Sequence, residues 1–238
     1  MNEKSPAPAS RGTRTVIITG GNSGLGYATA AAILSTPGGA PWQVIIGCRD
    51  PQRAQEAVDR LTALPGRTGS VRAMALDLAS LASVREFADE VERRVREGSL
   101  PPVHAVVCNA GMQTGANQMT TVDGFESTFG VNHLGHFLLV TELLPSLEAP
   151  ARAVVVASNT HDPAKKAGAP APAWSSPRAL ARGELAPSPQ TDSPFVAGGR
   201  RYTTSKLANV YFTYGLAARL PDGVSANAFD PGLMPGPA

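Results

Sequence analysis

The stretch Thr15-Val16-Ile17-Ile18-Thr19-Gly20-Gly21-Asn22-Ser23-Gly24-Leu25-Gly26 decides the fold. Its apolar, β-branched first half is typical of a buried parallel strand. A glycine-rich turn follows, and an alanine-rich run to about Leu34 predicts a helix. This order predicts a dinucleotide-binding βαβ unit, although a tight turn without a ligand has the same order. Glycines let the backbone approach a pyrophosphate, whose charge the amide groups at the start of the helix would meet.

Strands and helices alternate along the rest of the chain. Further strands are predicted at Gln43–Cys48, Val71–Leu76, Val103–Cys108, Ala153–Ser158 and Val224–Phe229. Helices are predicted around Arg53, over Ala79–Arg96, over Gly124–Leu147 and from Tyr202 onward. The alternation predicts an α/β fold with a Rossmann-type, doubly wound parallel sheet in a single domain, 15–238. Residues 1–14 hold prolines and small or polar residues, which predicts a disordered arm rather than a signal peptide.

Composition narrows the class of protein. The chain has 238 residues, a formal net charge of +2 and an aromatic content of 5%. No basic stripe or set of stacking aromatics points to nucleic acid, and no stretch approaches the 18 or so apolar residues of a membrane helix. Cys48 and Cys108 each end an apolar run, so we expect buried thiols in a reducing cytoplasm.

The end of the second strand bears on cofactor choice. In a dinucleotide-binding fold this strand end faces the adenosine ribose, where an acidic residue would accept from a free 2′-hydroxyl. Here Arg49 comes first, and Arg53 follows one helical turn later. Both can meet a 2′-phosphate by charge-assisted hydrogen bonds, which favours NADP(H) over NAD(H). Asp50 lies close by and leaves the alternative open.

Other polar residues also follow strands. Asp77-Leu78 comes after the third strand and Asn109-Ala110-Gly111 after the fourth, at the carboxyl ends where ligands bind in such sheets. Asn132 lies among apolar neighbours and must find hydrogen-bond partners. His133 and His136 are three residues apart with no third ligand, so we expect no metal site.

The pair Tyr202-x-x-x-Lys206 supplies the candidate proton chemistry. One helical turn apart, the phenol and the ammonium would share a face, and the cation would lower the phenol pKa from its usual value of about 10. Such a tyrosine can exchange a proton with an alkoxide or an alcohol near neutral pH. Alone, the pair also fits a partly buried tyrosine beside a solvated lysine. Residues 159–200, rich in proline and alanine, separate it from Ser158 and predict a long insertion near the site.

Together these residues resemble the short-chain dehydrogenase/reductase family over about Thr15 to Gly232. Four motifs carry the resemblance in order: Thr19-Gly20-x-x-x-Gly24-x-Gly26, Asn109-Ala110-Gly111, Ser158, and Tyr202-x-x-x-Lys206. Gly47-Cys48-Arg49-Asp50, the stretch Asn132–Phe137 and the long insertion look most like the branch of retinol dehydrogenases and protochlorophyllide reductases.

The resemblance implies a role for each of these residues. Tyr202 would be the general acid/base, Lys206 would lower its pKa and contact the nicotinamide ribose, and Ser158 would hold the substrate carbonyl or hydroxyl. Asn132 would anchor a water that links Lys206 to solvent. The remaining cofactor contacts would come from the residues of the strand-end motifs: Thr19, Gly20, Asn22, Ser23, Gly24, Leu25, Gly26, Arg49, Arg53, Asp77, Leu78, Asn109, Ala110, Gly111, Pro231 and Gly232.

Family members usually continue past Pro-Gly into a substrate-covering segment, a helix and a last strand. We therefore expect the last strand to be missing here, as in a fragment or in a product with an incomplete substrate wall. The exposed sheet edge would invite pairing with another copy, so a homo-oligomer is compatible with the sequence. The leading hypothesis is an NADP(H)-dependent oxidoreductase that interconverts a carbonyl and an alcohol. The alternatives are a catalytically silent dinucleotide-binding sensor or scaffold, and a carbon–carbon double-bond reductase of the protochlorophyllide reductase type.

Overall fold

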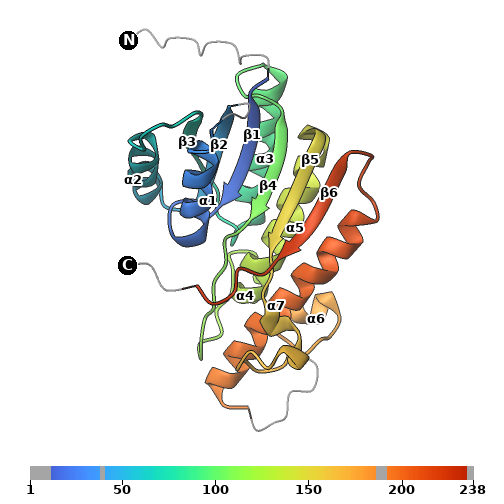
Figure 1. Ribbon diagram of the computed structural model, residues 1–238. Coiled ribbons are helices and arrows are strands. Elements are labelled where there is room, and N and C mark those ends of the chain that lie inside the picture. The colour runs from blue at the N-terminus through green and yellow to red at the C-terminus, as the bar shows by residue number, and fades with distance from the viewer. Residues whose placement is uncertain (1–11, 38–40, 186–191, 235–238) are drawn as a thin grey trace.

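A single parallel sheet runs through the protein and carries helices on both faces (Figure 1). The computed structural model describes residues 12–37, 41–185 and 192–234. The strands are β1 (Arg14–Thr19), β2 (Trp42–Cys48), β3 (Ser70–Ala75), β4 (Val103–Cys108), β5 (Leu147–Val156) and β6 (Val224–Phe229). The helices are α1 (Gly24–Leu34), α2 (Pro51–Thr62), α3 (Leu81–Arg96), α4 (Ser127–Phe129), α5 (Gly135–Leu143), α6 (Pro177–Ala181) and α7 (Pro194–Ala217).

The strand order confirms the predicted Rossmann-type topology. The sheet has six strands in the order β3-β2-β1-β4-β5-β6, and every pairing is parallel. The order reverses between β1 and β4, so a crevice opens at their carboxyl ends, where such sheets bind ligands. Within the described residues β6 pairs with β5 alone and forms an edge of the sheet.

Alternate residues of the central strands fill two separate cores. Val16 and Ile18 of β1 pack with α1 and α2 on one face, whereas Ile17 packs with α3, α5 and α7 on the other. Val44 and Ile45 of β2 divide between the faces in the same way. This division explains the continuous apolar runs of the central strands, which are buried on both sides. Cys48 and Cys108 are free and buried, as predicted.

Several predicted boundaries are wrong. Arg14 belongs to β1 rather than to the arm, of which residues 1–11 lie outside the described part. Strand β3 is shifted by one residue. Strand β5 begins at Leu147, which pairs with Val103 of β4, and its pairing with β6 begins at Ala151. Residues 186–191 of the insertion and 235–238 also lie outside the described part.

The expected helix over Gly124–Leu147 is interrupted. It consists of α4, a π-helical turn η1 (Gly130–Leu134), α5 and a 3₁₀ turn η2 (Leu144–Ser146). Glu126 caps the start, because its carboxylate accepts from the amides of Thr128 and Phe129 at 2.9 and 2.7 Å. The π-helical turn contains Asn132. Such turns are frequent at functional sites.

Helix α7 begins earlier than predicted. It starts at Pro194, behind a Ser193 hydroxyl that accepts from the Val196 amide at 3.4 Å, so Tyr202 lies well inside the helix. The part of the insertion before α7 contains two 3₁₀ turns, η3 (Asn159–His161) and η4 (Pro163–Lys165), as well as α6. No helix in the described part is long and apolar enough to cross a membrane.

Candidate active site

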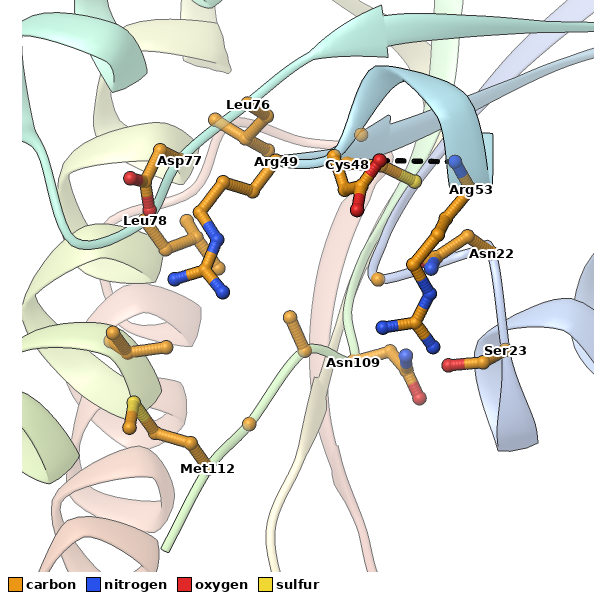
Figure 2. A pocket seen from close by; sticks show the side chains of 16 residues that line it. Asn22, Ser23, Cys48, Arg49, Arg53, Leu76, Asp77, Leu78, Asn109 and Met112 are labelled. Carbon is orange, nitrogen blue, oxygen red and sulfur yellow. Dashed lines mark hydrogen bonds between the residues drawn. The ribbon is translucent and has the colours of Figure 1, made fainter. Parts of the chain in front are cut away.

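A cavity of about 430 Å³ opens at the carboxyl ends of β1 to β4 (Figure 2). It lies at the reversal of strand order, as the fold predicts. Its lining includes many of the predicted cofactor residues: Gly20, Asn22, Ser23, Arg49, Arg53, Asp77, Leu78, Asn109, Ala110 and Gly111. Six further lining residues were not predicted as cofactor contacts. Five of them end strands or follow them, and Val131 lies in the π-helical turn: Gly47, Cys48, Asp50, Leu76, Met112 and Val131.

The glycine-rich turn is closed by contacts that a side chain would break. Gly20 has a φ of +65°, and a Cβ on Gly26 would lie 2.5 Å from the Gly20 carbonyl oxygen. The Ser23 side chain makes no capping hydrogen bond at the start of α1. Because the first amides of a helix lack intrahelical partners, this end of α1 can receive an anion beside the cavity.

Thr19 and Gly26 do not line the cavity and instead hold the surrounding backbone in place. Thr19 is fully buried, and its hydroxyl accepts from the backbone amides of Asn109 and Ala110, each at 2.9 Å. The Asn109 side-chain amide donates to the Thr19 carbonyl at 2.9 Å. These bonds fasten the end of β1 to the end of β4. The other predicted contacts outside the lining are Gly24, Leu25, Lys206, Pro231 and Gly232.

The arginines at the end of β2 face the cavity. Figure 2 shows the side chains of Arg49 and Arg53 projecting into the same open space, toward the side where Asn109 lies. Asp50 lines the cavity as well, and its carboxylate caps α2, where it accepts from the amides of Gln52 and Arg53 at 3.0 and 3.1 Å. This end of the cavity therefore carries two guanidinium groups and the Asp50 carboxylate, which is engaged as a helix cap.

Asp77 lies between Leu76 and Leu78, on the same side of the view as Arg49 and across from Arg53 (Figure 2). Its carboxylate accepts from the Ala79 amide at 3.0 Å, and its own amide donates to the Ser83 hydroxyl at 3.0 Å. These bonds fix the turn after β3. The wall then combines apolar leucine surface with one carboxylate, a surface suited to a flat heterocyclic base with an amino group.

The four predicted catalytic residues come together from three elements. Tyr202 and Lys206 lie on one side of α7, Ser158 follows β5, and Asn132 lies in the π-helical turn. The Ser158 oxygen accepts from the Thr160 amide and hydroxyl at 3.3 and 3.0 Å. Its own proton is left for Tyr202, with which it forms a hydrogen bond.

The pKa of Tyr202 is raised, whereas the sequence predicted that Lys206 would lower it. Burial raises the pKa of Tyr202, the Ser158 hydrogen bond opposes that rise, and the nearby Asp230 adds to it. Lys206 lies over the Tyr202 ring, 5.5 Å from its centre, but the net shift of the phenol pKa is upward because burial is its largest cause. Burial instead lowers the pKa of Lys206 to about 8. The group tuned toward the working range is the ammonium.

Lys206 and Asn132 are held by directed hydrogen bonds. The Lys206 ammonium donates to the Val156 carbonyl at 3.0 Å, and the Asn209 amide donates to the same oxygen at 3.3 Å. The Asn132 side chain accepts from the Met112 amide at 2.7 Å and donates to the Ser205 hydroxyl at 3.0 Å. Asn132 thus ties the segment after β4 to the turn of α7 that carries Tyr202.

The insertion contacts the same helix. The Ala173 amide donates to the Thr204 hydroxyl at 3.0 Å, and the Trp174 and Tyr211 rings meet edge to face with centres 4.9 Å apart. Arg200 pairs with Asp192 at 2.7 Å. The described part of the insertion is therefore fastened to α7.

Comparison with known proteins agrees with this geometry. The family model for short chain dehydrogenase matches residues 14–170. The chain belongs to the short-chain dehydrogenase/reductase family. The predicted likeness to the branch of retinol dehydrogenases and protochlorophyllide reductases is confirmed by the similar proteins.

Three curated relatives are similar over most of this chain. Human retinol dehydrogenase 14 is 39% identical, over 93% of this chain and 62% of its own. The chicken WW domain-containing oxidoreductase is 39% identical, over 93% of this chain and 49% of its own. Rice chloroplastic protochlorophyllide reductase B is 40% identical, over 82% of this chain and 48% of its own. The chain thus spans about half to three fifths of the length of these relatives.

Solved structures share the fold. An uncharacterised protein from Mycobacterium paratuberculosis superposes with a TM-score of 0.68 and 35% identity, over 92% of this chain and 68% of its own. An alcohol dehydrogenase from Thermococcus sibiricus, complexed with 5-hydroxy-NADP, gives a TM-score of 0.63, over 92% of this chain and 76% of its own. At 22% identity the second likeness concerns the fold alone.

Proposed function

We propose that this protein is an NADP(H)-dependent oxidoreductase that interconverts a carbonyl and an alcohol, with Tyr202 as proton donor and acceptor. The observation that carries the proposal is the grouping of Ser158, Tyr202 and Lys206: the Ser158 side chain interacts with the Tyr202 phenol, and the Lys206 ammonium lies over the Tyr202 ring. A substrate oxygen placed between the two hydroxyl groups would contact both. Family membership adds the reaction class.

The cavity fits a phosphorylated dinucleotide. The turn carries glycines where a Cβ would collide with the backbone, and the start of α1 offers amides to a pyrophosphate. Arg49 and Arg53, which line the cavity, would meet a 2′-phosphate, and Leu76, Asp77 and Leu78 would receive the adenine. When bound, the nicotinamide supplies the hydride.

The protein's part of the reaction is proton transfer and charge stabilisation. In reduction, the Tyr202 O–H bond breaks as the proton moves to the alkoxide oxygen, which becomes the alcohol. The phenolate that remains is stabilised by the Ser158 hydrogen bond and by the Lys206 ammonium. With a pKa of about 8, Lys206 can return a proton near neutral pH. Asn132 holds the turn of α7 that presents Tyr202.

A second candidate function is reduction of a carbon–carbon double bond. The 40% identity to a protochlorophyllide reductase favours it, and it would use the same Tyr202 and Lys206. The experiment is to follow NADPH consumption by the purified protein with aldehydes, ketones, quinones and protochlorophyllide. Consumption with carbonyl compounds supports the main proposal, and consumption with protochlorophyllide alone supports the second. Tight NADPH binding without turnover would favour a silent sensor or scaffold.

A further inference from the structure

His136 lies at the centre of a hydrogen-bond chain that the proposed proton transfer does not use. It belongs to α5 and is 1% exposed. Its Nδ1 lies 3.1 Å from the Asn132 carbonyl oxygen, and its Nε2 lies 2.8 Å from the Thr19 hydroxyl oxygen. One imidazole therefore bridges the end of β1 and the π-helical turn, two segments far apart in the sequence.

The partners at the two ends require the same position for the imidazole proton. A carbonyl oxygen only accepts, so His136 Nδ1 must carry the hydrogen that binds Asn132. At the other end, both lone pairs of the Thr19 hydroxyl are engaged by the amides of Asn109 and Ala110. Thr19 must then donate, and Nε2 must accept. The Val107 carbonyl, at 3.4 Å from the Thr19 hydroxyl, is the more distant acceptor.

The chain of bonds connects both halves of the site. It runs from the amides of Asn109 and Ala110, which line the cavity, through Thr19 and His136 to the Asn132 carbonyl. The Asn132 side chain continues it to Ser205, whose hydroxyl donates to the Tyr202 carbonyl at 2.7 Å. Burial lowers the pKa of His136 to about 4, so the ring stays neutral and keeps one donor and one acceptor.

We propose that His136 is a positioning residue, which, as the Nδ1–H tautomer, couples the cofactor loop after β4 to the segment of α7 that carries Tyr202. Its effect on turnover rests on the function proposed above, but its tautomer and its effect on nucleotide binding do not. A buried histidine that only fills space would also lower stability when replaced. The test therefore needs readouts that stability alone does not move.

The first readout is the tautomer in the intact chain. In the ¹⁵N spectrum of histidine-labelled protein, we expect a pyrrole-type Nδ1 and a pyridine-type Nε2 for His136 from pH 5 to 8. The His136→Gln variant assigns the signal by its disappearance. A hydrogen on Nε2, or an imidazolium at pH 6, would overturn the proposal.

The second readout is a double-mutant cycle between Thr19 and His136. Thr19→Val and His136→Phe each break the chain of hydrogen bonds. We expect each to weaken NADPH binding and to lower kcat, by about tenfold. The double variant should lose no more affinity or kcat than the more damaging of the two single variants. Thr19→Ser and His136→Asn, which keep the hydroxyl and the donor to Asn132, should recover part of the loss. His104→Gln, at the start of β4, is the control for replacing a histidine.

These measurements distinguish a positioning role of His136 from a purely structural one. Losses that add in the double variant, or a loss of melting temperature with unchanged nucleotide affinity and kcat, would overturn the positioning role. If the protein has no turnover at all, the proposed function fails, while the tautomer and the NADPH titration still decide the role of His136.

Discussion

Lys206 and Asn209 donate to one carbonyl oxygen, that of Val156 at the end of β5, at 3.0 and 3.3 Å. The two residues lie one turn apart on α7, and Lys206 is 4% exposed. The strand end thus fixes the ammonium over the Tyr202 ring, while a second donor keeps the carbonyl paired whatever the charge of Lys206. This arrangement maintains a buried cation next to the candidate proton donor, at a cost in stability.

Lys206→Met should abolish turnover but stabilise the protein at pH 7. Below pH 8 the ammonium is charged in both the folded and unfolded states, so the folded state carries the full burial cost, on the order of 3 kcal/mol. Between pH 8 and 10.5 the unfolded chain binds more protons, and wild-type stability rises with pH. Urea unfolding should show the advantage of the variant shrinking over this window.

Lys165→Met is the matched control, because Lys165 is exposed and should show little effect at either pH. An advantage of Lys206→Met that is the same at pH 7 and pH 10.5 would contradict the burial account.

Asn209→Leu should lower both stability and turnover. The His133 Nδ1 lies 3.2 Å from the Asn209 side-chain oxygen, and the substitution leaves this half-buried imidazole without that partner. We expect the free energy of unfolding to fall by about 1–3 kcal/mol. We also expect kcat to fall more than NADPH affinity, since Asn209 is remote from the cavity lining. Equal losses in both quantities would argue against a role centred on Lys206.

Arg49→Ala should remove most of the preference for NADP over NAD. Each charge-assisted phosphate contact is worth about 1.5–3 kcal/mol, which corresponds to a loss of roughly 10- to 100-fold in NADP affinity with NAD affinity unchanged. Fluorescence titration with both nucleotides measures this, with the exposed Arg96→Ala on α3 as control. Equal dissociation constants of NAD and NADP for the wild type would reject the assignment.

Gly26→Ala should damage the cofactor turn. The added Cβ would lie 2.5 Å from both the Gly20 carbonyl oxygen and the Asn109 amide nitrogen, so the backbone must shift. We expect a loss of about 1–3 kcal/mol in stability and at least a tenfold loss of nucleotide affinity. Gly215→Ala on α7, whose Cβ would meet only an arginine end at 3.7 Å, is the control and should stabilise its helix. Unchanged NADPH binding by Gly26→Ala would show that the turn does not hold the cofactor.

Local patterns predicted most of the fold. Strand β4 begins and ends where its apolar run does, because such runs report burial. The bounds of β6 are also as predicted, although most of its residues are exposed. The start of α7 was missed although Ser193-Pro194 is a helix-start signal, since the surrounding proline-rich composition obscured it. The π-helical turn at Gly130–Leu134 has no such local signal, because it depends on the partners that Asn132 finds across the site.

The sequence predicted which residues form the site, but not their side-chain contacts or their pKa values. Strand order brings Asn132, Ser158, Tyr202 and Lys206 together, and this follows from topology once the motifs are placed. The roles of Asp50 as a helix cap and of Thr19 as a buried link depend on side-chain direction, which spacing does not give. The predicted lowering of the Tyr202 pKa was wrong because spacing does not show burial either. Burial of Tyr202 and Lys206 outweighs the attraction between them.

The central claim is that Tyr202 exchanges the proton with the substrate. The most direct measurement compares Tyr202→Phe with Tyr214→Phe, an exposed tyrosine on the same helix, in NADPH titration and in NADPH-dependent reduction of the best carbonyl substrate. The account predicts that both variants bind NADPH like the wild type and that only Tyr202→Phe loses turnover, by at least about 100-fold. Undiminished reduction by Tyr202→Phe would contradict it.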